Sequence, residues 1–219
     1  MKLYEFAPTR SIRARWALQE LDLPFESVEI KLLEGAGQTP EYLALNPTGK
    51  VPTLVDGDFV VTESVAIVVY LAEKYPEKGL LPTDIKLRAQ LNRWMLFIAT
   101  ELEQPLWRIA RNSFLYPEEQ RQPTDIEIAQ GEFRQMAAVL EKHMQGREFL
   151  VGDRVSVGDF IAAYTLDWGN EAGLLDHVDL IAHRYFRHFS EGQEAGFGDA
   201  HGKIAEFLEI AAVRVIHPD

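Results

Sequence analysis

The stretch that most constrains the fold of this chain runs from residue 45 to residue 64. Two short strand-like runs, 53–55 and 59–61, flank an Asp-Gly pair, and this pattern predicts a β-hairpin. Val51-Pro52 stands directly before the first run, where a proline suits a tight turn, including one built on a cis peptide bond. An apolar run that follows the second strand predicts a helix. The sequence therefore predicts a hairpin that leads directly into a helix.

The two ends of this hairpin carry groups that suit a polar ligand. A turn at Pro52 would leave the Val51 amide pointing away from the sheet, free to bind a peptide backbone. Ser64 stands at the expected N-cap of the following helix, and a helix N-terminus favours an anionic group. The neighbouring Glu63 carboxylate favours an ammonium. Together these groups suit the α-amino-acid end of a ligand.

The residues before the hairpin predict a strand-helix-strand unit. Residues 3–6 and 25–30 have strand patterns, and an amphipathic helical pattern begins at Ser11 between them. Strands at this spacing pair in parallel through a right-handed crossover. A short helix is expected over 40–43. The order βαβ, short helix, ββα predicts a thioredoxin-like domain.

Beyond a segment with two prolines and a glycine, the pattern becomes helical throughout. The predicted fold class is an α/β thioredoxin-like N-terminal domain plus an all-α C-terminal helical domain. We expect the first domain over 1–77, the linker over 78–84 and the second domain over 85–219. Pro105 should kink or interrupt a helix over 85–112. Further helices are expected over 124–143, 178–189 and 204–215.

Two capping boxes are expected in the helical half. Thr124 and Glu127 have the spacing of the first, and Ser156 and Asp159 that of the second. Asp159 would be buried among apolar neighbours while its carboxylate reaches back to the Ser156 amide. We therefore assign Asp159 to folding rather than to catalysis.

Composition excludes several classes of function. A net charge of −12 argues against a nucleic-acid partner. The chain has no cysteine, which excludes disulfides and a cysteine nucleophile, and its six histidines show no metal-ligand spacing, so we expect no metal. No apolar run approaches the length of a membrane span. The N-terminus has no signal-peptide pattern, so we expect a cytoplasmic protein.

The arrangement Asn-Pro-x-Gly-x-Val-Pro-x-Leu-x-Asp-Gly over 46–57, followed by Glu-Ser and an apolar helix, resembles the glutathione transferase family. The resemblance covers essentially the whole chain and is most specific over 3–71. The Ala-Pro-Thr run at 7–9 resembles a bacterial branch of this family, one with disulfide-reductase activity. The family's all-helical second domain and its Ser-x-x-Asp box at 156–159 agree with the pattern read from the residues.

The resemblance implies that the working hydroxyl follows the first strand. There the hydroxyl of family members stabilises the glutathione thiolate; lowering the pKa of a free thiol by about two units would leave most of it ionised at neutral pH. Thr9 is favoured for this role, with Ser11 as a second donor or only a helix cap. A threonine departs from the commonest family pattern and weakens the expectation of fast conjugation.

The resemblance also implies a set of glutathione contacts. The Val51 backbone should pair with the cysteinyl part while Pro52 holds the loop, and Glu63 and Ser64 should take the γ-glutamyl ammonium and carboxylate. Gln38 and Lys50 could reach the glycine carboxylate or the peptide carbonyls. The alternative for both is that of a solvated loop residue.

The second substrate is expected between the two halves, against the first helix of the second. The candidates are Trp107, Arg108, Arg111, Phe114 and Tyr116, although aromatic residues at helical spacing also suit a helical core. An arginine facing this cleft would favour an acidic or electron-withdrawing substrate. The family is dimeric, so the resemblance implies a homodimer.

The expected function is that of a cytoplasmic detoxification enzyme that conjugates glutathione to small apolar electrophiles. Two alternatives stay open: a glutathione-dependent disulfide or peroxide reductase without its own cysteine, and a non-catalytic glutathione-binding stress or regulatory protein. An isomerase acting on a maleyl-type substrate is a weaker third, because only the Ser-Ile-Arg-Ala-Arg run at 11–15 matches that branch.

Overall fold

The structure is a computed structural model that describes residues 1–7 and 9–175. The chain divides into two compact units, and the boundary lies between Leu81 and Pro82, inside the predicted linker 78–84. The helices predicted over 178–189 and 204–215 lie outside the described residues.

The first unit contains a four-stranded mixed sheet in the order β2-β1-β3-β4. Strands β1 and β2 pair in parallel, with Leu3 opposite Ser27, whereas β1 with β3 and β3 with β4 pair antiparallel. The predicted hairpin and the predicted parallel βαβ unit are both confirmed. The strands are β1 (Lys2–Glu5), β2 (Glu26–Glu29), β3 (Thr53–Asp56) and β4 (Phe59–Thr62).

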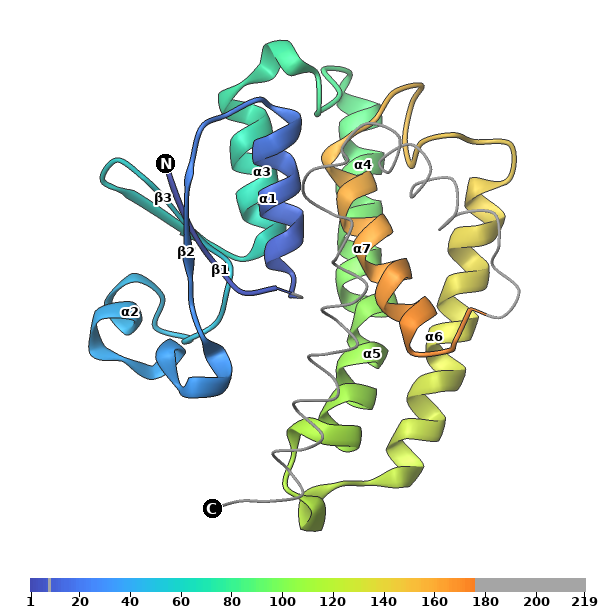
Figure 1. The fold of residues 1–219 in the computed structure, drawn as a ribbon. Helices are drawn as coiled ribbons and strands as arrows, with labels where there is room; N and C mark the ends of the chain where they lie inside the picture. The colour runs from blue at the N-terminus through green and yellow to red at the C-terminus, as the bar shows by residue number, and fades with distance from the viewer. Residues whose placement is uncertain (8, 176–219) are drawn as a thin grey trace. The chain divides into compact units, whose positions relative to one another are not determined.

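Helices α1 (Ser11–Glu20) and α3 (Ser64–Lys74) pack side by side against one face of this sheet, and α2 (Pro40–Leu45) lies on its other side (Figure 1). The N-caps expected at Ser11 and Ser64 are wrong by one residue, since Arg10 and Glu63 hold those positions. Short 3-10 turns complete the unit, at Leu32–Glu34, Ala36–Gln38 and Pro76–Lys78.

Apolar side chains from the two helices and the central strands form the core of this unit. Burying each such side chain contributes about 1.5–3 kcal/mol. A polar contact on the outside holds the hairpin to α3, because Asp56 accepts hydrogen bonds from Tyr70, at 2.6 Å, and from Lys74. The fully buried apolar residues include Leu3, Ala14, Leu18, Leu54, Ile67, Val68 and Leu71.

The second unit is helical over the residues that the structure describes. Pro105 lies in α5, and a π-helical turn directly before α5 breaks the α-helical pattern, which confirms the predicted interruption. Helix α6 packs along α5, while α7 packs against α4 and α5. The elements are α4 (Ile85–Phe97), the π-helical turn Ile98–Leu102, α5 (Glu103–Ala110), the π-helical turn Arg111–Leu115, the 3-10 turn Glu118–Gln120, α6 (Pro123–Met144) and α7 (Val157–Glu171).

Of the two expected capping boxes, one forms. At the start of α7 the buried Asp159 carboxylate accepts hydrogen bonds of 2.7 Å from the Ser156 amide, the Ser156 hydroxyl and the Leu150 amide. The box expected at Thr124 is wrong. Helix α6 begins at Pro123 with Gln122 as its N-cap, because the first helical position suits a residue without an amide hydrogen.

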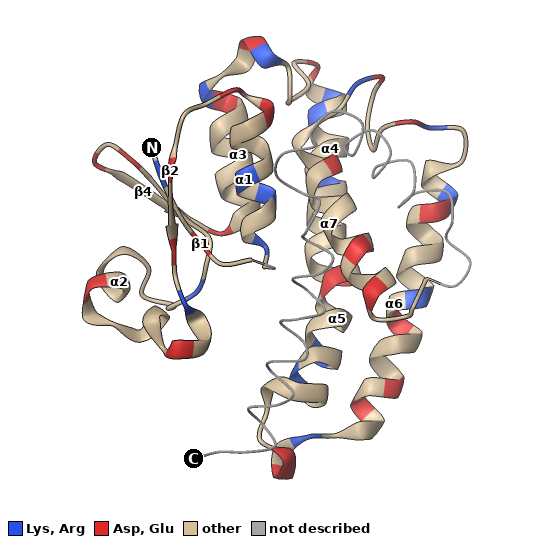
Figure 2. Cartoon of the chain, viewed as in Figure 1, with Lys and Arg blue, Asp and Glu red and all other residues tan. Residues whose placement is uncertain are grey.

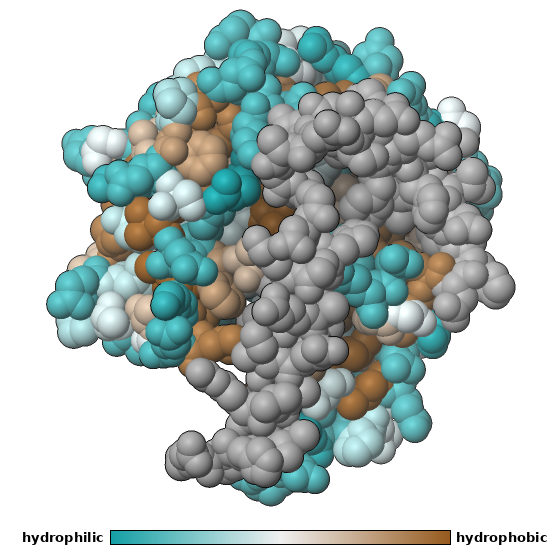
Figure 3. All heavy atoms as spheres, in the orientation of Figure 1, coloured by the Kyte–Doolittle hydropathy of each residue, from teal (hydrophilic) through white to brown (hydrophobic). Residues whose placement is uncertain are grey.

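Charged residues of both signs are spread over both units, and in the second unit acidic residues lie along α6 and α7 (Figure 2). On the visible face of the first unit, hydrophilic side chains are interspersed with smaller apolar areas (Figure 3). No helix among residues 1–7 and 9–175 is long and apolar enough to cross a membrane.

Candidate functional site

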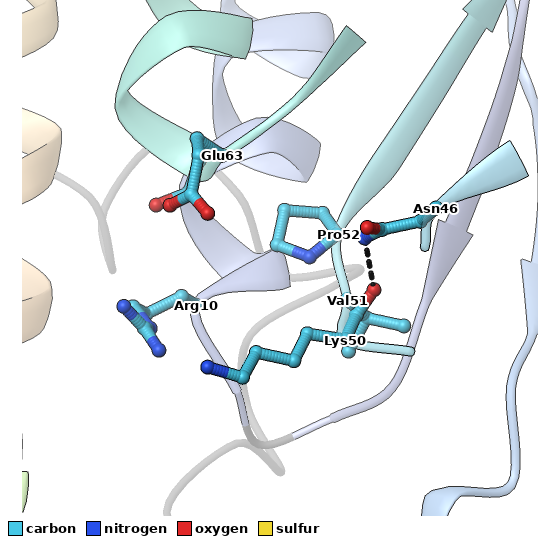
Figure 4. Close-up of a pocket in the computed structure, with 7 residues that line it drawn as sticks. Arg10, Asn46, Lys50, Val51, Pro52 and Glu63 are labelled. Carbon is cyan, nitrogen blue, oxygen red and sulfur yellow. Dashed lines mark hydrogen bonds between the residues drawn. The ribbon is translucent and has the colours of Figure 1, made fainter. Parts of the chain in front are cut away.

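A pocket in the first unit is lined by residues from three separate parts of the chain. One comes from the turn before α1, four come from the loop before β3, and two come from the start of α3. The side chains of Arg10, Lys50 and Glu63 point toward a common space, so two cations and one carboxylate face each other (Figure 4). The lining residues are Arg10, Asn46, Lys50, Val51, Pro52, Glu63 and Ser64.

The loop before β3 is held by two buried side chains. The Tyr42 hydroxyl donates a hydrogen bond of 2.6 Å to the Lys50 carbonyl oxygen, and the Asn46 amide donates one of 2.7 Å to the same oxygen. The Val51–Pro52 peptide bond that follows is cis, as the sequence allowed. The Val51 backbone forms no hydrogen bond with another residue in the described part of the chain. It lines the pocket with its polar groups available to a ligand.

Close backbone contact fixes the outer part of the same loop. Gly49 has a φ of +67°, and a side chain there would lie 2.3 Å from the Gln38 amide nitrogen and 2.7 Å from the Gly37 carbonyl oxygen. Only glycine fits such a position without strain. Gln38 therefore lies against the loop next to Lys50, but it is exposed and is not among the lining residues.

The start of α3 combines an unusual backbone with a buried hydroxyl. Glu63 has a φ of +66° and a ψ of +116°, a conformation that is costly for any residue except glycine. Ser64 is 5% exposed and accepts a hydrogen bond of 3.3 Å from the Arg13 guanidinium. Arg13 is itself 1% exposed, so a buried guanidinium from α1 contacts the first residue of α3.

The turn between β1 and α1 contains both predicted thiol donors. The Thr9 hydroxyl donates to the Phe6 carbonyl oxygen at 2.5 Å and accepts from the Ser11 amide at 3.2 Å. The Ser11 hydroxyl lies 2.9 Å from that of Thr9 and accepts from the Phe6 amide at 3.3 Å. Thr9 is partly exposed, whereas Ser11 is 1% exposed. Of the two, Thr9 is the one that a ligand can reach without rearrangement of the helix.

The structure brings most of the predicted glutathione contacts into one pocket, namely Lys50, Val51, Pro52, Glu63 and Ser64. Sequence reasoning missed two lining residues. Asn46 appears in the predictions only as part of the motif over 46–57, although its spacing of four from Tyr42 across a short predicted helix was a usable signal. The sequence predicts no ligand contact for Arg10, because nothing in it fixes the direction of that side chain.

The residues predicted for a second substrate lie in the second unit, on α5 and the turn after it. Arg108 donates to Asp125 and Glu132 of α6, and the hydrogen bond with Arg108 lowers the pKa of Asp125. Trp107 packs edge-on against Trp168, with ring centres 5.4 Å apart. Within this unit, therefore, Arg108 serves the packing of α5 on α6.

The other three predicted residues are more open, and Tyr116 among them is exposed. Arg111 is exposed and lies over the Trp107 ring at 5.8 Å, and Phe114 is partly exposed. Among the described residues, no group of three or more histidine, cysteine or acidic side chains is arranged to hold a metal ion.

Comparisons with known proteins bear on both units. Residues 1–73 match the sequence profile "Glutathione S-transferase, N-terminal domain", and residues 100–174 match "Glutathione S-transferase, C-terminal domain". A zeta-class glutathione S-transferase of Euphorbia esula is 40% identical over 166 residues, which cover 73% of this chain and 71% of that protein. Glutathione S-transferase GST-4.5 of Xanthomonas campestris is 33% identical over 180 residues, covering 80% of this chain and 85% of that protein.

Among solved structures, the chain is similar to a human theta-class glutathione transferase in complex with the glutathione conjugate of 1-menaphthyl sulfate. The two share 28% identity with a TM-score of 0.84, over 97% of this chain and 90% of that one. The fold is therefore the thioredoxin-like sheet domain followed by a helical domain that this structural neighbour has. With matched profiles in both units and relatives of this identity and coverage, the chain belongs to the glutathione S-transferase family.

Proposed function

We propose that this chain binds glutathione in the pocket of the first unit and conjugates the glutathione thiolate, through a new bond to its sulfur, to a small apolar electrophile. The observation that carries the proposal is the match of charges. Glutathione, with two carboxylates and one ammonium, carries a net negative charge, and the pocket presents a net positive charge from Arg10, Lys50 and Glu63. This cationic excess lies in a chain whose net charge is −12, so it is a local feature of the pocket.

The proposed binding mode follows from the groups on each wall. The γ-glutamyl ammonium binds Glu63. The γ-glutamyl carboxylate binds at Ser64, whose hydroxyl accepts a hydrogen bond from the Arg13 guanidinium. The cysteinyl backbone pairs with Val51, whose own backbone groups have no partner in the described part of the chain. Lys50, with Gln38 beside it, takes the glycine carboxylate. This mode directs the sulfur toward the turn before α1.

Thr9 is proposed as the hydrogen-bond donor to the thiolate. To do so, its hydroxyl exchanges the bond to the Phe6 carbonyl for one to the sulfur, a rotation about a single side-chain bond. Ser11 is the weaker candidate because it is buried and bonded to the Phe6 amide. Its proposed part is to support Thr9 through their mutual hydrogen bond. The active site is thus of the serine/threonine type, and the Xanthomonas relative supports a bacterial-type enzyme.

Aromatic and cationic side chains of the second unit are the proposed contacts of the electrophile. Trp107, Arg111 and Phe114 offer aromatic and cationic surface for an electrophile, whereas Arg108 is bonded to α6. Membership of the family supports a homodimer with a cytoplasmic detoxification role. The proposed domain limits remain 1–77 and 85–219, joined by 78–84.

A titration of the absorbance of the bound thiolate tests the proposal. We expect the thiol of bound glutathione to titrate about two pH units below the free thiol in the wild type and in Thr9→Ser. Thr9→Val, which keeps the shape and removes the hydroxyl, should raise the midpoint, and Ser11→Ala should raise it less. A wild-type midpoint equal to that of free glutathione overturns the proposed activation, and equal midpoints in wild type and Thr9→Val overturn the role of Thr9.

The substrate preference separates the proposal from its main rival. A transferase should act faster on an aryl halide than on a hydroxyethyl disulfide, and the reverse order would identify a glutathione-dependent reductase. Tight binding with an unshifted thiol midpoint and no turnover would identify a binding protein.

A further inference from the structure

In the β1–α1 turn, the hydroxyl hydrogens of Thr9 and Ser11 are both used in hydrogen bonds within the chain. Each hydroxyl carries one donor hydrogen. The Thr9 hydrogen is directed at the Phe6 carbonyl oxygen, so the 2.9 Å contact between the hydroxyls must use the hydrogen of Ser11. A sulfur arriving at this turn gains a hydrogen bond only when Thr9 gives up the one to Phe6. A single neutral donor obtained by exchange stabilises an anion less than a charged group does.

Arg10 supplies a charged group at the same turn. It is the N-cap residue of α1 and lies between Thr9 and Ser11 in the chain. It is partly exposed and lines the pocket, and its guanidinium points into the space that it shares with Lys50 and Glu63 (Figure 4). A guanidinium stays charged throughout the range over which a thiol titrates.

We infer that Arg10 holds the glutathione thiolate by its charge while Thr9 supplies the hydrogen bond. This inference rests on the proposed function, which assigns Arg10 no part in stabilising the thiolate. The thiol proton leaves to bulk water, and no bond within the chain is made or broken. A cation within reach of a thiol lowers its pKa by about one to three units.

The other charged groups around the pocket have different positions. Lys50 is exposed and belongs to the loop before β3, on the side proposed for the glycine carboxylate. Arg13 is buried and bonded to Ser64 at the γ-glutamyl end. Glu63 is the one acidic lining residue; it opposes a thiolate, and the γ-glutamyl ammonium offsets its charge. Arg10 is therefore the lining cation on the turn toward which the sulfur is directed.

The test compares the thiolate titration of bound glutathione in the full-length wild type, Arg10→Gln, Arg10→Lys and Lys31→Gln. Lys31 is exposed, pairs only loosely with Glu34, at 3.5 Å, and is not among the pocket-lining residues, so its variant changes the net charge by the same amount without altering the lining. We expect Arg10→Gln to raise the midpoint by about one pH unit or more. Arg10→Lys should recover part of that shift, and Lys31→Gln should leave the midpoint unchanged. Arg10→Met replaces Arg10→Gln if the latter does not fold.

A second readout separates charge from binding. Affinity for glutathione should rise with pH between the bound and free thiol midpoints, whereas affinity for S-methylglutathione, which has no ionisable thiol, should not. Arg10→Gln should lose more affinity for glutathione than for S-methylglutathione at mildly alkaline pH.

The negative results distinguish a failure of the proposed function from a failure of the role of Arg10. A wild type that binds neither ligand overturns the proposed function and this inference together. A wild-type midpoint below that of free glutathione, with the same midpoint in Arg10→Gln or with an equal rise in Lys31→Gln, overturns the role of Arg10 alone.

Discussion

The phenol of Tyr42 donates a hydrogen bond of 2.6 Å to the carbonyl oxygen of Lys50, the residue that precedes the Val51–Pro52 peptide. The Asn46 amide donates a second bond to the same oxygen. Burial raises the pKa of the Tyr42 phenol, so it remains a protonated donor at neutral and mildly alkaline pH. Buried side chains, rather than the ladder of the sheet, therefore hold the pocket-lining backbone.

Tyr42→Phe should weaken both the fold and the pocket. The variant loses the bonds to the Lys50 carbonyl and to the Thr53 hydroxyl, the latter 3.0 Å away, while Asn46 still satisfies the carbonyl. We expect the free energy of unfolding to fall by about 1 kcal/mol. Glutathione affinity should fall by about three- to tenfold because the Val51 backbone is less well positioned. Denaturant unfolding and titration calorimetry measure the two effects.

Tyr4→Phe is the matched control. The Tyr4 ring packs 5.9 Å from that of Tyr42, and its hydroxyl has no hydrogen-bond partner among the described residues. This variant should bind glutathione as the wild type does. If Tyr42→Phe binds as tightly as Tyr4→Phe, the hydroxyl of Tyr42 has no part in positioning the loop.

Periodic and turn-forming patterns were enough to predict most of the described fold. The hairpin followed from Asp56-Gly57 between two apolar runs, and the parallel unit followed from strand spacing. Helix starts were predicted less well, because serine hydroxyls at Ser11 and Ser64 bind the Phe6 amide and the Arg13 guanidinium instead of capping their own helices. A local cap motif cannot reveal such a tertiary partner.

The sequence predicts the site residues whose positions follow from the backbone geometry. It does not predict a site residue whose part depends on the direction of a long side chain. Val51, Pro52 and Ser64 follow from the turn and the helix that the motif specifies. Arg10 is one of three arginines near the start of α1, and the sequence does not say which points at the pocket. In the structure Arg13 is buried and Arg15 pairs with Glu5, so Arg10 lines the pocket.

Glu63 should show opposite effects on stability and binding. Its φ of +66° is strained for glutamate and permitted for glycine, so Glu63→Gly should raise the free energy of unfolding by about 1 kcal/mol. The same variant removes the proposed partner of the γ-glutamyl ammonium and should weaken glutathione binding about tenfold or more. Thermal unfolding and calorimetry report the two quantities separately.

Glu63→Gln isolates the charge from the backbone. It keeps the side-chain shape and the strained φ, so its stability should match that of the wild type while binding weakens. A Glu63→Gly variant less stable than Glu63→Gln would show that the side chain stabilises the fold through contacts that outweigh the strain.

Asp159 should matter for folding alone. Its carboxylate is fully buried and accepts from two backbone amides and one hydroxyl, so Asp159→Ala leaves the Leu150 and Ser156 amides buried without an acceptor. Since each such loss costs about 1–3 kcal/mol, the free energy of unfolding should fall by about 3 kcal/mol or more. Denaturant unfolding measures the loss. Asp153→Ala, at an exposed position in the preceding turn, should change it little.

Asp159→Asn refines this prediction. An amide side chain can accept from one of the buried amides but places a donor against the other, so its stability should lie between those of the wild type and Asp159→Ala. Equal stability of Asp159→Ala and Asp153→Ala would mean that the capping box does not stabilise the second unit.

Glu171, the last residue of α7, should make stability fall as pH rises. Burial, together with the Asp167 carboxylate one turn earlier, raises the pKa of Glu171 from its ordinary value of 4.5 to about 8. The folded chain therefore keeps this proton up to about pH 8, while the unfolded chain releases it above about pH 4.5. The free energy of unfolding should decrease across this interval.

Glu171→Gln removes the titrating group and should flatten that decrease. At pH 8 we expect the variant to be more stable than the wild type by about 1 to 2 kcal/mol, less than the full pKa shift implies because water screens a partly exposed carboxylate. Near pH 4 the two should be equal, since both side chains are then neutral. Chemical unfolding from pH 4 to pH 8 measures the difference, with Glu127→Gln, exposed on α6, as the control. A difference that is the same at both ends of the range would mean that Glu171 does not titrate between them.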